Sequence, residues 1–113
     1  SIRENVPTIN AEPFPEMILG NNDKKSARKE LIEISLKNLS SAYQLSHNAP
    51  FKGGHITRYF GAPEDNVSAL QLERNKNLYM DDSERNYHPE RANEMAQLLS
   101  SNFKDLLQLL HAL

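Results

Sequence analysis

Residues 67–73 read Val-Ser-Ala-Leu-Gln-Leu-Glu, and this alternation decides how the rest of the chain can fold. In an extended segment, Ser68, Leu70 and Leu72 fall on one side, whereas Val67, Ala69, Gln71 and Glu73 fall on the other. The pattern predicts a strand over these residues. Glu73 ends this strand, at the place where open α/β sheets present their ligands.

Two amphipathic helices are predicted, one before this strand and one after it. Apolar residues recur at three-to-four spacing from Asp23, which can cap a helix, to about His47. Their broad apolar face suggests packing beneath a sheet. The second helix is predicted over residues 89–112, because Pro89 suits a first helical turn and a stripe of methionine, phenylalanine and leucine side chains follows it.

Two further extended segments are predicted. Residues 17–19, Met-Ile-Leu, are long enough only for a short strand within the otherwise irregular residues 1–23. Residues 55–60, His-Ile-Thr-Arg-Tyr-Phe, follow a Lys-Gly-Gly turn and are rich in β-branched and aromatic side chains, which favours a strand. The order of the elements predicts part of an α/β layered fold.

Composition excludes several classes of protein. The 113 residues suffice for one domain with a modest core, and the lack of cysteine excludes disulfides, thiolate metal sites and a cysteine nucleophile. With 13 basic and 15 acidic residues, the chain has no field that would attract nucleic acid. No apolar run approaches the ~20 residues that cross a bilayer. We therefore expect a cytoplasmic protein with neither nucleic acid nor a membrane as partner.

The charged residues within apolar segments are the first functional candidates. Histidines stand at positions 47, 55, 88 and 111, and none has the spacing of a metal ligand, so no metal-binding residue is predicted in this chain. Arg58 interrupts a segment that is otherwise apolar or aromatic, and Glu73 ends the segment with Leu70, Gln71 and Leu72. Long charged groups in such settings tend to be paired or functional. An edge strand whose charges reach solvent remains the alternative.

Residues 48–81 carry a more specific signal. Residues 48–61 read Asn-Ala-Pro-Phe-Lys-Gly-Gly-His-Ile-Thr-Arg-Tyr-Phe-Gly, and they are followed by Ala-Leu-Gln-Leu-Glu at 69–73 and Leu-Tyr-Met-Asp at 78–81. In order and spacing these phrases closely resemble the C-terminal part of N-formylglutamate amidohydrolases. Ser-Ile-Arg at residues 1–3 also resembles the segment that directly follows a metal-binding histidine in that family.

The resemblance implies a fold and a reaction. The fold would be part of a zinc-carboxypeptidase-like three-layer α/β fold, with a mixed sheet flanked by helices. The reaction would be the hydrolysis of N-formyl-L-glutamate to formate and L-glutamate, with a divalent metal, expected to be zinc, that activates a water. The metal ligands are expected upstream of residue 1. Residues 1–113 would thus be the C-terminal portion of a single domain without its N-terminal metal-binding half.

The resemblance also implies roles for single residues. Glu73 would be the general base, which takes a proton from the water and returns it to the leaving amine. The candidate substrate-binding residues are Arg58, Arg3, Asn48, Gly53, Gly54 and Tyr79. The arginines are favoured because a guanidinium matches a substrate carboxylate with two hydrogen bonds, Arg58 before Arg3. The paired glycines would let the backbone approach the substrate closely.

Two classes of function therefore stay open. In the first, the chain acts on a small N-acyl amino acid together with the missing N-terminal half of its domain. In the second, it is a non-catalytic α/β binding or regulatory module, in which Arg58 and Glu73 form an ion pair with each other. The chain begins Ser-Ile-Arg without an initiator methionine. Under the first hypothesis, we expect the 113 residues alone to expose apolar surface and to be inactive as a hydrolase.

Overall fold

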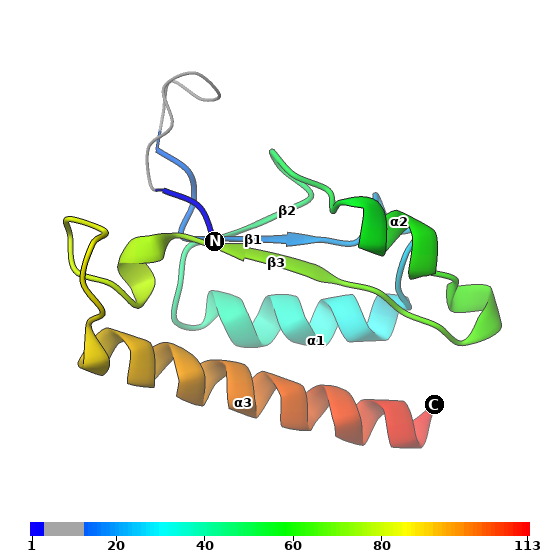
Figure 1. Ribbon diagram of the computed structural model, residues 1–113. Helices are drawn as coiled ribbons and strands as arrows, with labels where there is room; N and C mark the ends of the chain where they lie inside the picture. The colour runs from blue at the N-terminus through cyan, green and yellow to red at the C-terminus, as the bar shows by residue number, and fades with distance from the viewer. Residues whose placement is uncertain (4–12) are drawn as a thin grey trace.

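The structure is a computed structural model that describes residues 1–3 and 13–113. Its three strands are β1 (Met17–Gly20), β2 (Leu45–His47) and β3 (Gln71–Arg74). They form one sheet in the order β2-β1-β3, in which β1 runs parallel to β2 and antiparallel to β3 (Figure 1). The sheet is therefore mixed, as predicted. The part of the irregular stretch that falls on residues 4–12 lies outside the described residues.

Helices cover one face of this sheet. Helix α1 (Lys29–Ser40) lies directly against the sheet, and the long helix α3 (Pro89–Ala112) lies beneath α1 (Figure 1). The short helix α2 (His55–Phe60) is on the other side of the sheet, and single turns of 3₁₀ helix occur at Pro63–Asp65 and Lys76–Leu78. This arrangement shows an α/β fold and confirms the helix predicted over residues 89–112.

The core lies between the sheet and the helices α1 and α3. Its buried members are Met17, Leu19, Ile32, Leu39, Leu78 and Met95. Leu70 and Leu72 pack against this cluster, and the alternation in residues 67–73 predicts that they share a side. In the register of the sheet, Glu73 is paired with Ile18, and the neighbouring pair joins Leu72 to Leu19. Successive residues of β3 therefore face the core and the opposite side of the sheet in turn.

The helix predicted over residues 23–47 is wrong at both ends. Asn22, Asp23 and Lys24 have positive φ angles of 50°, 52° and 72°, so they form a turn, and Arg28 takes the N-cap position instead of Asp23. At the other end, α1 stops at Ser40 and residues 45–47 join the sheet as β2, with Leu45 paired to Met17. The apolar spacing continued past the helix because an edge strand also needs apolar residues that face the core.

The strand predicted over residues 55–60 is also wrong, because these residues form α2. Hydrogen bonds from Arg58 N to Gly54 O and from Gly61 N to Thr57 O, both 3.2 Å, are helical in spacing. Thr57 is 3% exposed and packs against Gly53, where an added Cβ would lie 2.8 Å from the threonine side chain. This contact fixes the segment as a helical turn despite its β-branched and aromatic residues.

The third predicted strand, residues 67–73, begins later than expected and ends one residue further on. Only residues 71–74 pair with β1, while Val67 forms an isolated bridge with Ala62 and Ala69 N donates to Ser26 O at 2.7 Å. The earlier part of the segment thus closes a loop over the start of α1. Glu73 nevertheless stays near the carboxyl end of its strand.

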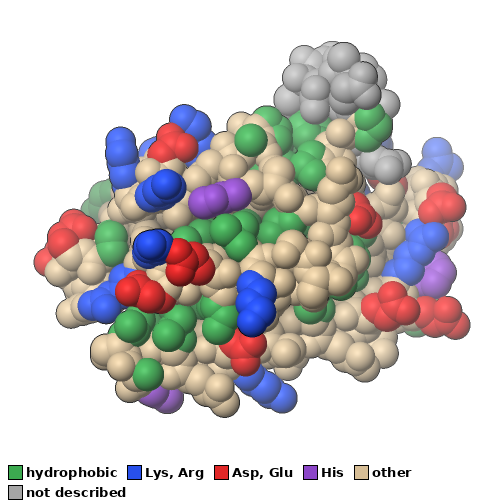
Figure 2. All heavy atoms as spheres, turned by 180° about the vertical axis from the view of Figure 1, so that it is seen from behind, with side chains coloured by type: hydrophobic (Ala, Val, Ile, Leu, Met, Phe, Trp, Pro, Cys, Tyr) green, Lys and Arg blue, Asp and Glu red, His purple; other side chains and the backbone are tan. Residues whose placement is uncertain are grey.

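Apolar side chains remain exposed on two helices. Tyr59 and Ile56 of α2 are 71% and 70% exposed, and Phe103 and Leu107 of α3 are both 57% exposed. Figure 2 shows hydrophobic side chains gathered around the C-terminal half of α3. Only part of the predicted apolar stripe of α3 therefore packs on the core. Among the described residues, none of the helices combines the length and the hydropathy that a bilayer crossing needs.

Candidate active site

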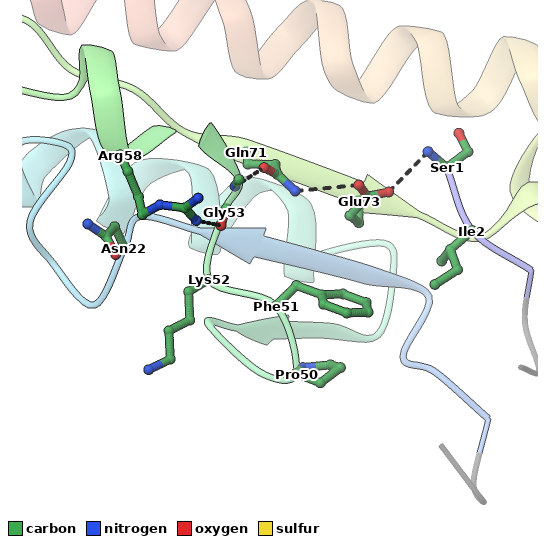
Figure 3. Close-up of a pocket in the computed structure, with 11 residues that line it drawn as sticks. Ser1, Ile2, Asn22, Pro50, Phe51, Lys52, Gly53, Arg58, Gln71 and Glu73 are labelled. Atoms are coloured by element: carbon green, nitrogen blue, oxygen red, sulfur yellow. Dashed lines mark hydrogen bonds and ion pairs between the residues drawn. The ribbon is translucent and has the colours of Figure 1, made fainter. Parts of the chain in front are cut away.

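A cavity of about 640 Å³ opens on the sheet face that the helices α1 and α3 leave free (Figure 3). Its lining comes from the start of the chain, the turn after β1, the loop before α2, α2 itself and β3. The lining residues are Ser1, Ile2, Asn22, Pro50, Phe51, Lys52, Gly53, Gly54, Arg58, Gln71 and Glu73. The structure thus brings together Glu73, Arg58 and the two glycines, four of the seven residues that the sequence singled out.

Glu73 projects from β3 into this cavity, with its side chain 28% exposed. Its Oε2 atom lies 3.0 Å from the amino nitrogen of Ser1. The first residues are held there by the backbone, since Ile2 N donates to Arg74 O and Lys76 N donates to Ile2 O, both at 2.9 Å. Residues 1–2 therefore continue alongside the end of β3, and Ser1 lies beside the Glu73 carboxylate.

Gln71 reaches the same cavity from the position two residues before Glu73. Its Oε1 accepts a hydrogen bond from Gly54 N at 2.6 Å, and its Nε2 donates to Glu73 Oε1 at 3.4 Å. The sequence prediction did not include this residue among the site residues. The signal was present, because alternate residues of a strand share a face and Gln71 shares the face of Glu73.

Arg58 and Gly53 form the opposite wall. Arg58 Nη1 donates to the carbonyl oxygen of Gly53 at 3.2 Å, and the arginine is otherwise exposed to solvent. Gly53 has a φ of 120°, a conformation that disfavours every residue with a Cβ atom. The glycine is thus required by the turn that carries the arginine. The ion pair that the non-catalytic hypothesis placed between Arg58 and Glu73 is not found between these two described residues.

Lys52 adds a second cation to the lining. Its Nζ lies 2.7 Å from Asp23 Oδ2, and its carbonyl oxygen accepts from Asn22 N at 2.8 Å. The backbone of Lys52 also passes so close to Gly20 that a Cβ there would lie 2.5 Å from its carbonyl carbon. Lys52 and Asn22 were not predicted as site residues; Lys52 stands in the motif next to Gly53, and for Asn22 no sequence signal is apparent.

The other three predicted residues lie outside the cavity lining. The exposed side chain of Arg3 has its Nε 3.7 Å from Glu84 Oε2. Asn48 donates from Nδ2 to Asn21 Oδ1 at 2.7 Å, in a polar cluster at the end of β2. Tyr79 packs against the core, with the Arg74 guanidinium 5.2 Å from the centre of its ring.

No group of three or more histidine, aspartate or glutamate side chains that could hold a metal ion is found within residues 1–3 and 13–113. Two of the histidines make other contacts. His88 caps α3, where its Nδ1 accepts from Arg91 N at 3.3 Å, and His55 stacks on Tyr59 with ring centres 5.3 Å apart. The residues present therefore do not fit a metal centre by themselves.

Comparison with known proteins shows the family to which the chain belongs. The family model described as N-formylglutamate amidohydrolase matches residues 1–80, which include every residue that lines the cavity. The chain belongs to the N-formylglutamate amidohydrolase family. The resemblance carried by the phrases within residues 48–81 is thereby confirmed. The matched range ends before the long helix α3 begins.

Individual members of this family are also similar to the chain. N-formylglutamate deformylase from Pseudomonas aeruginosa is 40% identical over 84 residues, which cover 73% of this chain and 32% of that protein. The N-formylglutamate deformylase of Pseudomonas putida is 35% identical over 99% of this chain and 42% of that protein. The chain thus spans less than half of the length of these relatives.

A solved structure shows the same fold. The crystal structure of N-formylglutamate amidohydrolase from Ralstonia eutropha superposes on the whole chain with a TM-score of 0.82 at 20% sequence identity. The match takes in 42% of that protein. The arrangement of one mixed sheet with helices therefore recurs within a longer polypeptide.

Proposed function

We propose that the chain takes part in the hydrolysis of N-formyl-L-glutamate to formate and L-glutamate. The proposal is supported by membership of the family and by the names of the two Pseudomonas relatives. The observation that carries it is the cavity itself, which has Glu73 and Arg58 in one lining, with Gln71 and the Gly53-Gly54 loop between them (Figure 3). A base and a carboxylate-binding group are what hydrolysis of an acidic amide requires.

Glu73 is the general base in this proposal. It accepts a proton from the water as the water oxygen bonds to the formyl carbon and the carbonyl electron pair moves onto oxygen, giving a tetrahedral intermediate. It then passes that proton to the amide nitrogen as the intermediate collapses and the carbon–nitrogen bond breaks, which separates formate from the amine of glutamate. Its position supports this role, because the carboxylate lines the cavity and its side chain is 28% exposed, accessible to a water. Gln71 donates to Oε1, and the Ser1 nitrogen lies 3.0 Å from Oε2.

Arg58 binds a substrate carboxylate in this proposal. Its guanidinium uses Nη1 for the Gly53 carbonyl and has further N–H groups that can reach a carboxylate. Lys52 also belongs to the lining, but its ammonium is paired with Asp23 at 2.7 Å, whereas Arg3 contacts Glu84 outside the cavity lining, so Arg58 is the candidate for the substrate carboxylate. Asn48 and Tyr79 lie outside the lining and would act on the site only through the residues that separate them from the cavity.

The complete enzyme would be larger than this chain. We propose that residues 1–113 are the C-terminal portion of one zinc-carboxypeptidase-like domain, located in the cytoplasm, and that the portion alone is inactive. A divalent metal, expected to be zinc, would be held by residues that precede Ser1.

The test is hydrolysis of N-formyl-L-glutamate by the full-length protein, measured as formate released. The unaltered protein is expected to turn the substrate over, and Glu73→Gln is expected to lower kcat by about 100-fold or more, with a smaller change in KM. Glu64→Gln, the same change at an exposed glutamate outside the cavity lining, is the matched control. Near-normal turnover by Glu73→Gln would remove this residue from the mechanism, and no formate from the unaltered protein would refute the substrate.

A further inference from the structure

Gln71 occupies the middle of a hydrogen-bonded chain that runs along the cavity from Arg58 to Glu73 (Figure 3). The Arg58 guanidinium donates to the carbonyl of Gly53 at 3.2 Å. The Gly54 N–H, at the other end of the same peptide unit, donates to Gln71 Oε1 at 2.6 Å, and Gln71 Nε2 donates to Glu73 Oε1 at 3.4 Å. Two charged side chains are therefore connected through one peptide and one amide.

The backbone sets the direction of this chain. A peptide N–H can only donate, so the atom of Gln71 that meets Gly54 is the oxygen, and the amide nitrogen is left to donate to Glu73. The Glu73 carboxylate accepts this bond at Oε1, while its Oε2 lies 3.0 Å from the Ser1 nitrogen. The guanidinium on the carbonyl of the peptide polarises it and strengthens its N–H as a donor.

We propose that Gln71 is a positioning residue, which fixes the orientation of the Glu73 carboxylate and ties it to Arg58 through the peptide between Gly53 and Gly54. The proposal rests on the proposed function, in which Glu73 accepts the proton and Arg58 binds the substrate. Gln71 takes no proton itself. By holding Oε1, it restricts rotation of the Glu73 carboxylate, so that less orientational freedom is lost in the transition state.

Gln71→Met tests this role because methionine keeps the length of the side chain and removes both hydrogen bonds. In the full-length protein, kcat is expected to fall about tenfold while KM changes much less. The loss is expected to vanish in a Glu73→Asp background, since the shorter carboxylate no longer reaches Gln71. Gln97→Met, the same change at an exposed position of α3, is the matched control and is expected to have no effect.

Comparing Gln71→Met in the unaltered and the Glu73→Asp backgrounds distinguishes positioning from a merely structural role. A structural role would lower activity equally in the unaltered and the Glu73→Asp backgrounds, and that result would overturn the proposal. Full activity of Gln71→Met in the unaltered background would overturn it as well.

A second measurement does not depend on activity. In nuclear magnetic resonance spectra of the full-length protein, the Gly54 amide proton is expected to lie downfield, as a donor in a short hydrogen bond, and to move upfield in Gln71→Met. Glu73→Asp is expected to move the side-chain amide signals of Gln71. If these signals move but the unaltered protein hydrolyses no N-formylglutamate, the proposed function fails and the positioning chain stands. If they do not move, the positioning chain is refuted whatever the activity.

Discussion

The two faces of β3 present opposite environments within one residue of each other. Leu72 packs against the buried cluster formed with α1 and α3, whereas Glu73 lines an open cavity on the other side of the sheet. The core face is continuous, apolar and made by elements with regular periodicity. The cavity face is made by loops, a two-glycine turn and the first residues of the chain. One face therefore contributes mainly stability, and the other presents the chemical groups.

The largest effect is expected for a substitution in the core face. Leu39 is 1% exposed in the middle of the core, so Leu39→Ala is expected to lower the free energy of unfolding by about 2–5 kcal/mol. Urea denaturation of the full-length protein measures it, and a loss of less than about 1 kcal/mol would contradict this placement of the core. Leu107→Ala, the same change at an exposed position of α3, should cost little, and a large cost would show that another segment covers that helix.

A smaller effect is expected on the cavity face. Arg58→Ala removes the guanidinium proposed to bind a substrate carboxylate, so KM for N-formylglutamate is expected to rise about tenfold with little change in stability. Steady-state kinetics and a denaturation curve on the same variant separate the two quantities. The matched control is Arg85→Ala, at an exposed arginine outside the cavity lining. An unchanged KM in Arg58→Ala would count against the carboxylate contact.

The smallest effect is expected outside both faces, in the loop that leads to α3. A hydrogen bond from the Ser83 hydroxyl, followed by one from the Asn86 amide, holds the pKa of Asp81 well below its ordinary value. A carboxyl with a lowered pKa in the folded state contributes stability above its ordinary pKa, and this contribution is lost as pH falls through the lowered value. The side-chain amide signals of Asn86, whose Nδ2 donates to Asp81 Oδ2, should thus stay constant in nuclear magnetic resonance spectra from neutral pH to about pH 4 and change only below it.

Asp81→Asn sharpens this expectation. The amide keeps the size of the side chain but loses the charge. The acid-induced change in the side-chain amide signals of Asn86 is therefore expected to disappear. A titration near the ordinary carboxyl range in the unaltered protein would show that the hydrogen bonds from Ser83 and Asn86 do not form in solution.

The sequence predicted the core face well because that face rests on periodicity. Alternation placed Leu70 and Leu72 on one side of the strand and Glu73 on the other, and three-to-four spacing gave the helix over residues 89–112. The errors arose where the spacing fits more than one structure. Leu45 continues a helical pattern, yet it pairs with Met17 in the sheet. Residues 55–60 have the composition of a strand, yet the contact between Thr57 and Gly53 accompanies a helical turn.

The sequence by itself determined the family, the amphipathic elements and the candidate roles of Glu73 and Arg58, because motifs and periodicity are local properties. Only the tertiary structure decided which candidates share a cavity. It placed Gln71 and Lys52 in the lining and left Arg3, Asn48 and Tyr79 outside it. The physical reason is that the cavity joins residues distant in sequence, as where the Ser1 nitrogen meets Glu73 at 3.0 Å. Such contacts depend on strand register and on the path of loops, and neither follows from local pattern.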